Sequence, residues 1–316
     1  MKKDLRIIFM GTPDFAVATL KTLIDNDYNI VGVITAPDKP AGRGRKLNES
    51  AVKKYATSKG LNILQPTNLK SETFLETLKL LKANLQIVVA FRMLPKVVWQ
   101  MPEYGTFNLH ASLLPNYRGA APINWAIING ETKTGVSTFF IDEKIDTGAM
   151  IYQKEVNILP NETAGDLHNK LMVIGSKLVL ETVKSIEEGN IKTIPQPENT
   201  VIKTANKLNK ENCRINWNDS LDTIYNMVRG LNPYPTAWCL IKNNDKELNT
   251  KIYNVEKCVE EHSFEIGKII STKTEVRVAV NKGFIILKEI KIPGKRKMDI
   301  KSLLNGYIFD VNAKML

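Results

Sequence analysis

The chain begins with short apolar runs that alternate with an amphipathic segment. Residues 5–10 are apolar except for Arg6 and form a run that ends at Gly11, and residues 14–25 then place apolar side chains at helical spacing. A second apolar run follows at 30–34 and completes a strand, helix, strand unit. The pattern therefore predicts two buried parallel strands with a helix packed against them.

The same alternation continues to about residue 190. Further strands are expected at 85–90, 106–109 and 136–141, and helices at 49–59, 71–82, 122–129 and 163–188. Strands that alternate with helices, some of them apolar on both faces, predict an α/β fold with a doubly wound, mostly parallel, Rossmann-like sheet. In such a sheet the functional site lies at the carboxyl ends of the strands.

The pattern changes after residue 190. Residues 191–200 contain two prolines and little apolar periodicity, which is typical of a linker. Asp219 is expected to cap a helix that ends at Gly230. Short alternating strands are expected after it, at 251–258, 267–271, 275–280 and 283–292. Short strands at this spacing indicate a small β-barrel or sandwich. Since 316 residues suit about two domains, we expect a first domain at 1–190, a linker at 191–206 and a second, β-rich domain at 207–316.

The composition shows an excess of positive charge, and the sequence argues against a membrane-spanning or secreted protein. The formal net charge is +11, and residues 201–316 alone hold 20 basic and 13 acidic side chains. A lysine-rich genome and a polyanionic partner explain this excess equally well. The longest largely apolar run, residues 85–91, has seven residues with Gln86 among them, well short of the roughly 18 that a membrane span needs. The N-terminus lacks the pattern of a signal peptide. We therefore expect a cytoplasmic protein with no membrane association, and a monomer, because no heptad pattern is present.

The sequence lacks the residue patterns of a metal site, a dinucleotide-binding site and a P-loop. The three cysteines and three histidines are scattered along the chain, so no metal site is expected. The turn Gly11-Thr12-Pro13 has neither the glycine pattern of a dinucleotide site nor the Gly-Lys-Ser/Thr of a P-loop. We expect the fold to work without bound NAD.

One segment has the residues for acyl transfer. Asn108 and His110 are two apart on an expected strand, so their side chains share a face. Asp142, Glu143 and Asp146 follow another strand end, which should bring carboxylates to the same edge of the sheet. An amide and an imidazole can hold the oxyanion of a tetrahedral intermediate, and a carboxylate can hold the imidazolium. A buried structural histidine is the alternative.

The stretch from Asn108 to Gly119, N-L-H-x-S-L-L-P-x-x-x-G, resembles the folate-dependent formyltransferases. This resemblance implies that Asn108, His110 and Asp146 are the catalytic residues, and it favours Asp146 over Asp142 because a Thr-Gly pair follows Asp146. It also implies 10-formyltetrahydrofolate as co-substrate and no metal. The folate-binding segment would be Ser112, Leu113, Leu114 and Pro115.

The likeness extends over the whole chain, through residues 6–15, 37–47 and 232–238, to the members that formylate initiator methionyl-tRNA. It implies that the second domain is an OB-like, tRNA-binding barrel. The basic segment 37–47 is either a solvated loop or a phosphate-contacting arm, and the resemblance favours an arm that enters the acceptor end of the tRNA. Its basic residues are Lys39, Arg43, Arg45 and Lys46.

The segment 89–95 departs from the family pattern, since Arg92 replaces a glycine near the expected folate pocket. Two rival functions stay open. One is a related formyltransferase that acts on a small amine, such as glycinamide ribonucleotide or an amino sugar nucleotide. The other is a non-catalytic RNA-binding protein on the same scaffold. The four basic residues of segment 37–47 argue against the first, and the intact catalytic trio argues against the second.

Overall fold

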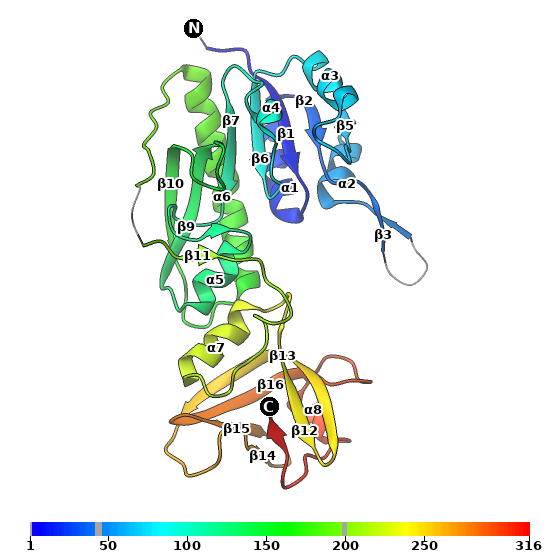
Figure 1. Ribbon diagram of the computed structural model, residues 1–316, viewed down its shortest axis with the longest axis vertical. Helices are drawn as coiled ribbons and strands as arrows, with labels where there is room; N and C mark the ends of the chain where they lie inside the picture. The colour runs from blue at the N-terminus through cyan, green and yellow to red at the C-terminus, as the bar shows by residue number, and fades with distance from the viewer. Residues whose placement is uncertain (1, 42–45, 198–200) are drawn as a thin grey trace. The chain divides into compact units, whose positions relative to one another are not determined.

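The computed structural model describes residues 2–41, 46–197 and 201–316 (Figure 1). The contacts divide the chain into two compact units. The first unit comprises Met1–Gly119, Thr134–Val156 and His168–Thr204, and the second comprises Ala120–Lys133, Asn157–Leu167 and Ala205–Leu316.

The first unit is built on a seven-stranded sheet. Its strands are β1 (Arg6–Gly11), β2 (Asn29–Ile34), β5 (Ile63–Leu64), β6 (Leu85–Val89), β7 (Thr106–His110), β9 (Lys133–Phe140) and β10 (Met150–Asn157). They lie in the order β10-β9-β7-β6-β1-β2-β5 (Figure 1). The pairs from β5 to β7 are parallel, whereas β9 runs antiparallel to β7. The doubly wound, mostly parallel sheet is therefore confirmed, and β10 is a strand that the pattern did not predict.

Helices and short strands complete this part of the chain. The helices are α1 (Asp14–Asp25), α2 (Ala51–Ser58), α3 (Glu72–Leu80), α4 (Lys96–Trp99) and α6 (Ala164–Glu188). The short strands are β3 (Lys39–Ala41), β4 (Lys46–Asn48), β8 (Arg118–Gly119) and β11 (Thr204–Ala205). Helix α1 buries Phe15, Leu20 and Leu23, as its amphipathic spacing predicts.

The core of this unit follows from the apolar runs. All five residues of β6 are buried, so the strand has no polar face. Gly11 ends β1 where the chain turns into α1, and a Cβ at this position would lie 2.5 Å from the Cβ of Ala16. The turn therefore requires glycine at this position, because any side chain would collide with the helix.

The second unit is a small antiparallel barrel with helices. Its strands are β12 (Ala237–Asn243), β13 (Lys246–Val259), β14 (Ile269–Ser271), β15 (Val276–Val280), β16 (Gly283–Lys291), β17 (Met298–Asp299) and β18 (Lys314–Met315). Its helices are α5 (Pro122–Ile128), α7 (Leu221–Gly230) and α8 (Ile300–Leu304). The strands follow the order β14-β15-β16-β13-β12-β18, with β17 beside β16.

The two ends of this sheet meet. Lys268 forms an antiparallel bridge with Lys314, and the amide of Met315 donates to the carbonyl of Gly267 at 2.8 Å. These contacts nearly close the sheet into the predicted barrel, which leaves few unpaired strand edges.

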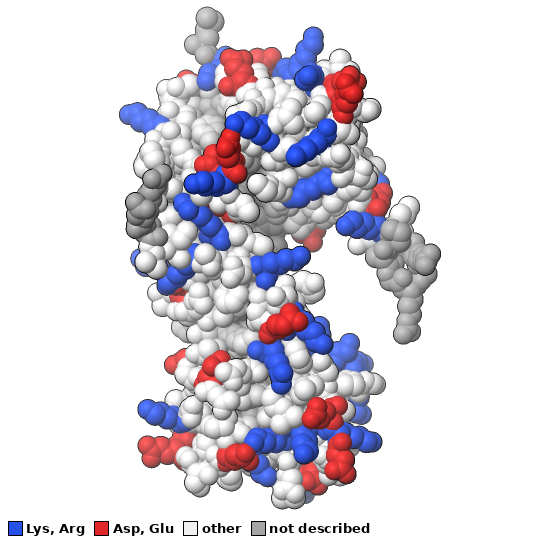
Figure 2. Space-filling view, viewed as in Figure 1, with Lys and Arg blue, Asp and Glu red and all other residues white. Residues whose placement is uncertain are grey.

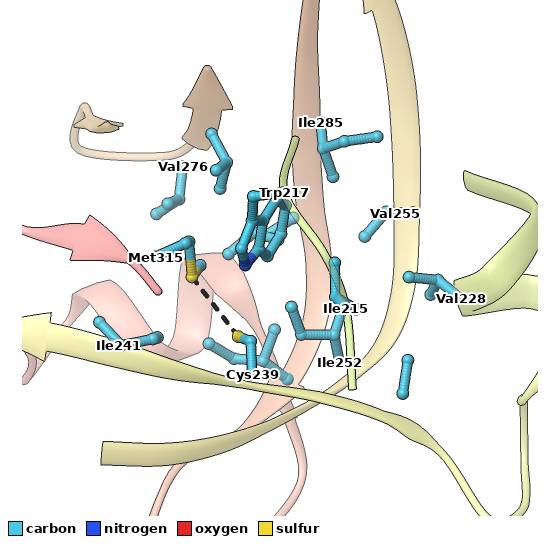
Figure 3. Close-up of a cluster of buried hydrophobic side chains, with 14 of the residues drawn as sticks. Ile215, Trp217, Val228, Cys239, Ile241, Ile252, Val255, Val276, Ile285 and Met315 are labelled. Atoms are coloured by element: carbon cyan, nitrogen blue, oxygen red, sulfur yellow. Dashed lines mark hydrogen bonds between the residues drawn. The ribbon is translucent and has the colours of Figure 1, made fainter. Parts of the chain in front are cut away.

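The barrel encloses an apolar core. Figure 3 shows Trp217 among Ile215, Val276, Ile285 and Met315, with the thiol of Cys239 3.6 Å from the sulfur of Met315. Burial raises the pKa of the Cys239 thiol to about 12, so this thiol is neutral in the folded protein. Cys213, Cys239 and Cys258 are all free thiols.

One predicted helix cap was wrong. Helix α7 is capped by Ser220, whose hydroxyl accepts a hydrogen bond from the amide of Thr223 at 3.1 Å. The expected cap, Asp219, instead accepts from the side chain of Asn216 at 2.9 Å in the preceding turn. Both residue types cap helices, so the sequence pattern alone did not separate them.

Candidate active site

Asn108 and His110 lie at the end of β7, on one face of the strand. Their neighbours Phe107 and Leu109 point to the other face, where Leu109 packs against Gly175 of α6. His110 is 6% exposed and Asn108 is half-buried. The Asn108 amide makes no hydrogen bond within the part of the chain that the structure describes. A partly buried amide of this kind is available to a ligand.

The His110 ring is held by one hydrogen bond. Its Nε2 lies 2.8 Å from the carbonyl oxygen of Tyr117. Because a carbonyl only accepts, Nε2 must carry a hydrogen, and Nδ1 is left to face the carboxylate of Asp146, 3.9 Å away. Tyr117 has a φ of 61°, in the left-handed region that non-glycine residues rarely adopt. Strained backbone of this kind often marks functional sites.

Asp146 reaches His110 by a route that the sequence did not indicate. We expected the carboxylates to follow a strand end at the same edge as His110. Strand β9 runs antiparallel to β7, and the residue after it, Ile141, donates to the carbonyl of Thr106 at the opposite end of β7. The loop therefore folds back before Asp146, whose carboxylate accepts from the amide of Gly119 at 2.9 Å. The reason for the predicted proximity was wrong.

The two other carboxylates of the loop are engaged elsewhere. Asp142 accepts from the hydroxyl of Thr147 at 2.7 Å and from the amide of Lys144 at 3.0 Å. Glu143 pairs with Lys96, and this hydrogen bond lowers the pKa of the Glu143 carboxyl. Among the three carboxylates considered, Asp146 is the one that the structure pairs with His110.

The segment 112–115 forms a turn with its polar groups directed inward. Ser112 is fully buried and its hydroxyl donates to the carbonyl of Asn116 at 2.7 Å. Leu114 is also buried, whereas Leu113 and Pro115 are half-buried. The hydroxyl of Ser137 donates to the Ser112 carbonyl at 2.6 Å and accepts from the Leu114 amide at 3.2 Å. This arrangement fixes the turn and leaves Leu113 and Pro115 as the residues with accessible surface.

The basic segment 37–47 begins and ends as a hairpin of β3 and β4, with Lys39 paired to Asn48. Lys39 is exposed, and Lys46 lies in β4. Arg43 and Arg45 lie outside the described residues. Asp38 anchors the base of the hairpin, since it pairs with Lys53 and accepts from Gln65 at 2.8 Å. The hydrogen bond from Lys53 lowers the pKa of the Asp38 carboxyl.

Arg92, the departure from the family pattern, is tied to another loop. Its guanidinium donates to the carbonyl of Thr67 at 3.0 Å and to the carbonyl of Pro66. It also lies over the ring of Phe91, 5.6 Å from the centroid. The side chain is exposed and connects the segment after β6 to the segment after β5.

Three residues around His110 were missed at the level of sequence. Tyr117 and Gly119 act through their backbone atoms, and both lie within the motif that pointed to the site. Gln196 donates to the carbonyls of Asp146 and Gly148 at 2.9 Å each. It lies in the proline-containing segment after α6, where no pattern signals a site.

The other histidines have structural contacts. His168 packs edge-on against Phe15, with ring centroids 5.3 Å apart. In the second unit, His262 Nε2 lies 2.9 Å from the carbonyls of Val280 and Gly283, and its Nδ1 accepts from the amide of Phe264. Within the described ranges no cluster of three or more His, Cys, Asp or Glu could hold a metal ion. No helix there is long and apolar enough to cross a membrane.

The positive charge of the second unit is partly neutralised by its own carboxylates. Figure 2 shows basic and acidic side chains interspersed over the visible surface. Three lysine pairs are Lys257–Asp222, Lys288–Glu256 and Lys297–Glu289. The charge excess of residues 201–316 therefore does not by itself locate an RNA-binding surface.

Comparisons with known proteins agree with the motif. Residues 5–183 match the formyl transferase family and residues 207–308 match its C-terminal domain. The chain is 63% identical over 313 residues to the methionyl-tRNA formyltransferase of Flavobacterium johnsoniae, covering 99% of both chains. It is 53% identical over 313 residues to that of Parabacteroides distasonis, covering 97% of both.

Solved structures share the fold at low identity. The sugar 3N-formyl transferase WlaRD, crystallised with dTDP and 5-N-formyl-THF, superposes with a TM-score of 0.66 at 20% identity, covering 93% of this chain and 100% of that one. HypX from Aquifex aeolicus, in complex with tetrahydrofolic acid, superposes with a TM-score of 0.63 at 19% identity, covering 96% and 47%. These likenesses bear on the fold alone.

Proposed function

The chain belongs to the formyl transferase family, and from this premise we propose that it transfers the formyl group of 10-formyltetrahydrofolate to the α-amino group of methionine on initiator methionyl-tRNA. The high identity to methionyl-tRNA formyltransferases over nearly the full length of both chains supports this acceptor. Such an enzyme supplies the starting aminoacyl-tRNA of translation, so the cytoplasm is its proposed location.

The observation that carries the proposal is the arrangement around His110. The side-chain amide of Asn108, which has no hydrogen-bond partner among the described residues, and the imidazole of His110, whose Nδ1 faces a carboxylate, lie two residues apart on one strand face. A formyl oxygen needs donors of this kind as it gains negative charge, so these residues fit the folate co-substrate. The co-substrate supplies the reactive formyl carbon.

In the proposed mechanism the neutral α-amine attacks the formyl carbon, the bond from this carbon to N10 of the folate breaks, and the proton lost by the amine is gained by N10, so that tetrahydrofolate leaves. Each residue has a separate role in this transfer. Asn108 donates a hydrogen bond to the oxygen that becomes negative when the amine attacks, and protonated His110 donates a second from Nδ1, because its Nε2 already donates to the carbonyl of Tyr117. Asp146 stabilises the charged imidazole through its own charge, because a separation of 3.9 Å exceeds a hydrogen bond.

The folate and tRNA contacts are assigned by the same resemblance. We assign folate binding to Ser112, Leu113, Leu114 and Pro115, of which Leu113 and Pro115 offer surface while Ser112 holds the turn. We assign tRNA contacts to the basic hairpin at 37–47 and to the barrel domain at 207–316. Residues 1–190 are the proposed catalytic domain, with a linker at 191–206.

One assay tests the function and its rivals. Purified protein and 10-formyltetrahydrofolate are offered methionylated initiator tRNA, methionylated elongator tRNA or small amines, including glycinamide ribonucleotide and an amino sugar nucleotide. We expect transfer to the initiator tRNA to be the fastest by far. Comparable rates with a small amine would contradict the acceptor, and no transfer to any of them would favour a non-catalytic RNA-binding protein.

A second experiment tests the hairpin. The double variant Arg43→Ala/Arg45→Ala should raise the KM for tRNA, because each lost phosphate contact weakens electrostatic binding, and should leave the KM for folate unchanged. The control is Lys177→Ala/Lys184→Ala, which removes the same charge from exposed positions on α6. An equal rise in both KM values, or an equal effect of the control, would contradict the assignment.

A further inference from the structure

Gln196 is a buried amide that uses all of its hydrogen-bonding groups. Its side-chain oxygen accepts from the Nε and Nη2 of Arg118 at 3.1 and 2.6 Å. Its nitrogen donates to the carbonyls of Asp146 and Gly148, at 2.9 Å each. The residue is 7% exposed. A glutamine has two donors and two acceptor sites, so this set of partners is complete.

The partners of Gln196 belong to the loop that carries Asp146. Asp146 has a φ of 57°, a left-handed conformation that a residue with a side chain keeps only where the surroundings hold it. Two contacts hold it: Gln196 binds its backbone carbonyl, and the amide of Gly119 binds its carboxylate. These contacts fix the backbone and the carboxylate separately, and the oxygen that Gly119 binds, Oδ2, is the one that lies 3.9 Å from Nδ1 of His110.

Arg118 determines which way the Gln196 amide points. A guanidinium has only donors and stays charged, so the end of the amide nearest to it must be the oxygen. The NH2 group is then directed to the two loop carbonyls. Because Arg118 directly precedes Gly119, one short segment binds the Asp146 carboxylate and orients the amide that binds the Asp146 backbone.

We propose that Gln196 is a positioning residue for the reaction, which acts by setting the place of the Asp146 carboxylate relative to His110. This inference rests on the proposed function. Gln196 touches neither Asn108 nor His110 in the described structure, so it acts through Asp146. Its segment is held independently, since Ile194 and Met150 exchange backbone hydrogen bonds at 2.8 and 2.9 Å. Removal of the side chain should therefore leave the segment in place.

Two substitutions separate the donors from the acceptor of Gln196. Gln196→Glu keeps an acceptor for Arg118 and loses the NH2 donors, whereas Gln196→Met loses both. Both should lower kcat by about 10- to 100-fold, since displacement of a catalytic group by about 1 Å can cost 10²-fold. The KM values for folate and tRNA should stay within about twofold of wild type, because Gln196 does not contribute to the binding of either substrate in the ground state. The control is Gln86→Met, which removes another buried amide of the same unit outside the site.

A double-mutant cycle with Asp146→Asn tests the route of action. If Gln196 works through the Asp146 carboxylate, Gln196→Glu should lower kcat much less in the Asp146→Asn background than in wild type. Independent, additive losses would overturn the positioning role, as would wild-type kcat in Gln196→Glu.

Should Gln196→Met not fold, Gln196→Glu still carries the test because it retains the contact with Arg118. Wild-type protein is the standard: no transfer by the wild type contradicts the proposed function, whereas an active wild type beside equally active Gln196 variants contradicts only this inference.

Discussion

The surroundings of His110 and the core of the barrel are both buried, but they are built from different interactions. Around His110, buried polar groups such as Ser112, Ser137 and Gln196 are joined by hydrogen bonds in nearly fixed geometry. Around Trp217, apolar side chains and the sulfur atoms of Cys239 and Met315 pack together with few polar contacts (Figure 3).

The two regions therefore contribute differently: the hydrogen-bonded region fixes the positions of side chains, and the apolar region supplies most of the stability. A hydrogen-bonded network specifies the positions of its members but adds only modest net stability, because each bond replaces one to water. Apolar burial is non-directional and supplies most of the free energy of folding. Changes near His110 should therefore alter catalysis first, and changes in the barrel core should alter the free energy of unfolding first.

The largest expected effect is that of His110→Ala on catalysis. Loss of the proposed oxyanion donor should lower kcat about 10²- to 10³-fold, equivalent to roughly 2.7–4 kcal/mol of transition-state stabilisation. The melting temperature should change by only a few degrees. Single-turnover formyl transfer and thermal unfolding measure the two quantities.

His168→Ala is the matched control for this variant, because it removes another imidazole of the same unit that packs against Phe15. We expect wild-type kcat from it. A His110→Ala enzyme with near wild-type turnover would show that the polar network is structural, and the contrast with the barrel core would disappear.

The second prediction concerns the barrel core. Ile252 of β13 is fully buried, so Ile252→Ala should lower the free energy of unfolding by about 2–5 kcal/mol, from lost transfer free energy and a new cavity. Ile252→Val should cost about 0.5–1.5 kcal/mol. Urea unfolding measures both. At low temperature, kcat per folded molecule should equal that of wild type; a fall in kcat parallel to the loss of stability would show that the two regions are not separable.

The sequence predicted the arrangement of residues around His110 only in part. Alternation along β7 placed Asn108 and His110 on one face at the strand end, and this depends only on the two-residue period of a strand. The approach of Asp146 depends on the antiparallel direction of β9, which the apolar pattern of 136–141 does not encode. Gln196 meets its partner Asp146 through side-chain to backbone bonds across 50 residues, a relation that leaves no periodicity in the sequence.

A third prediction concerns Ser137, a residue of the polar network around His110 whose loss should affect both stability and substrate binding. Ser137→Ala would leave the buried Ser112 carbonyl and Leu114 amide without their hydroxyl partner, at a cost of about 1–3 kcal/mol in the free energy of unfolding. Because these groups shape the turn at 112–115, the KM for folate should also rise. Thr138→Val is the control: Thr138 is the next residue of β9, points to the opposite face and bonds to Thr182. An equal rise in the folate KM for both variants would contradict the role of the turn.

The last prediction concerns the thiol of Cys239 in the apolar core. Its pKa is raised to about 12 by burial, from a value of 9.0 for an unperturbed thiol. Above pH 9 the thiol ionises in the unfolded chain but keeps its proton in the folded one. The unfolded state then binds fewer protons, so the free energy of unfolding falls as pH rises from about 9 towards 12, by at most about 1.4 kcal/mol per pH unit from this group.

Other groups also titrate in this range, so the measurement is a difference between two proteins. Urea unfolding of wild type and of Cys239→Ala is followed from pH 8 to pH 11. The variant is less stable at pH 8, because it has lost buried volume, but its stability should fall less steeply above pH 9. Parallel curves would mean that the thiol ionises equally in both states, and that the barrel core admits water around Cys239 where the packing in Figure 3 excludes it.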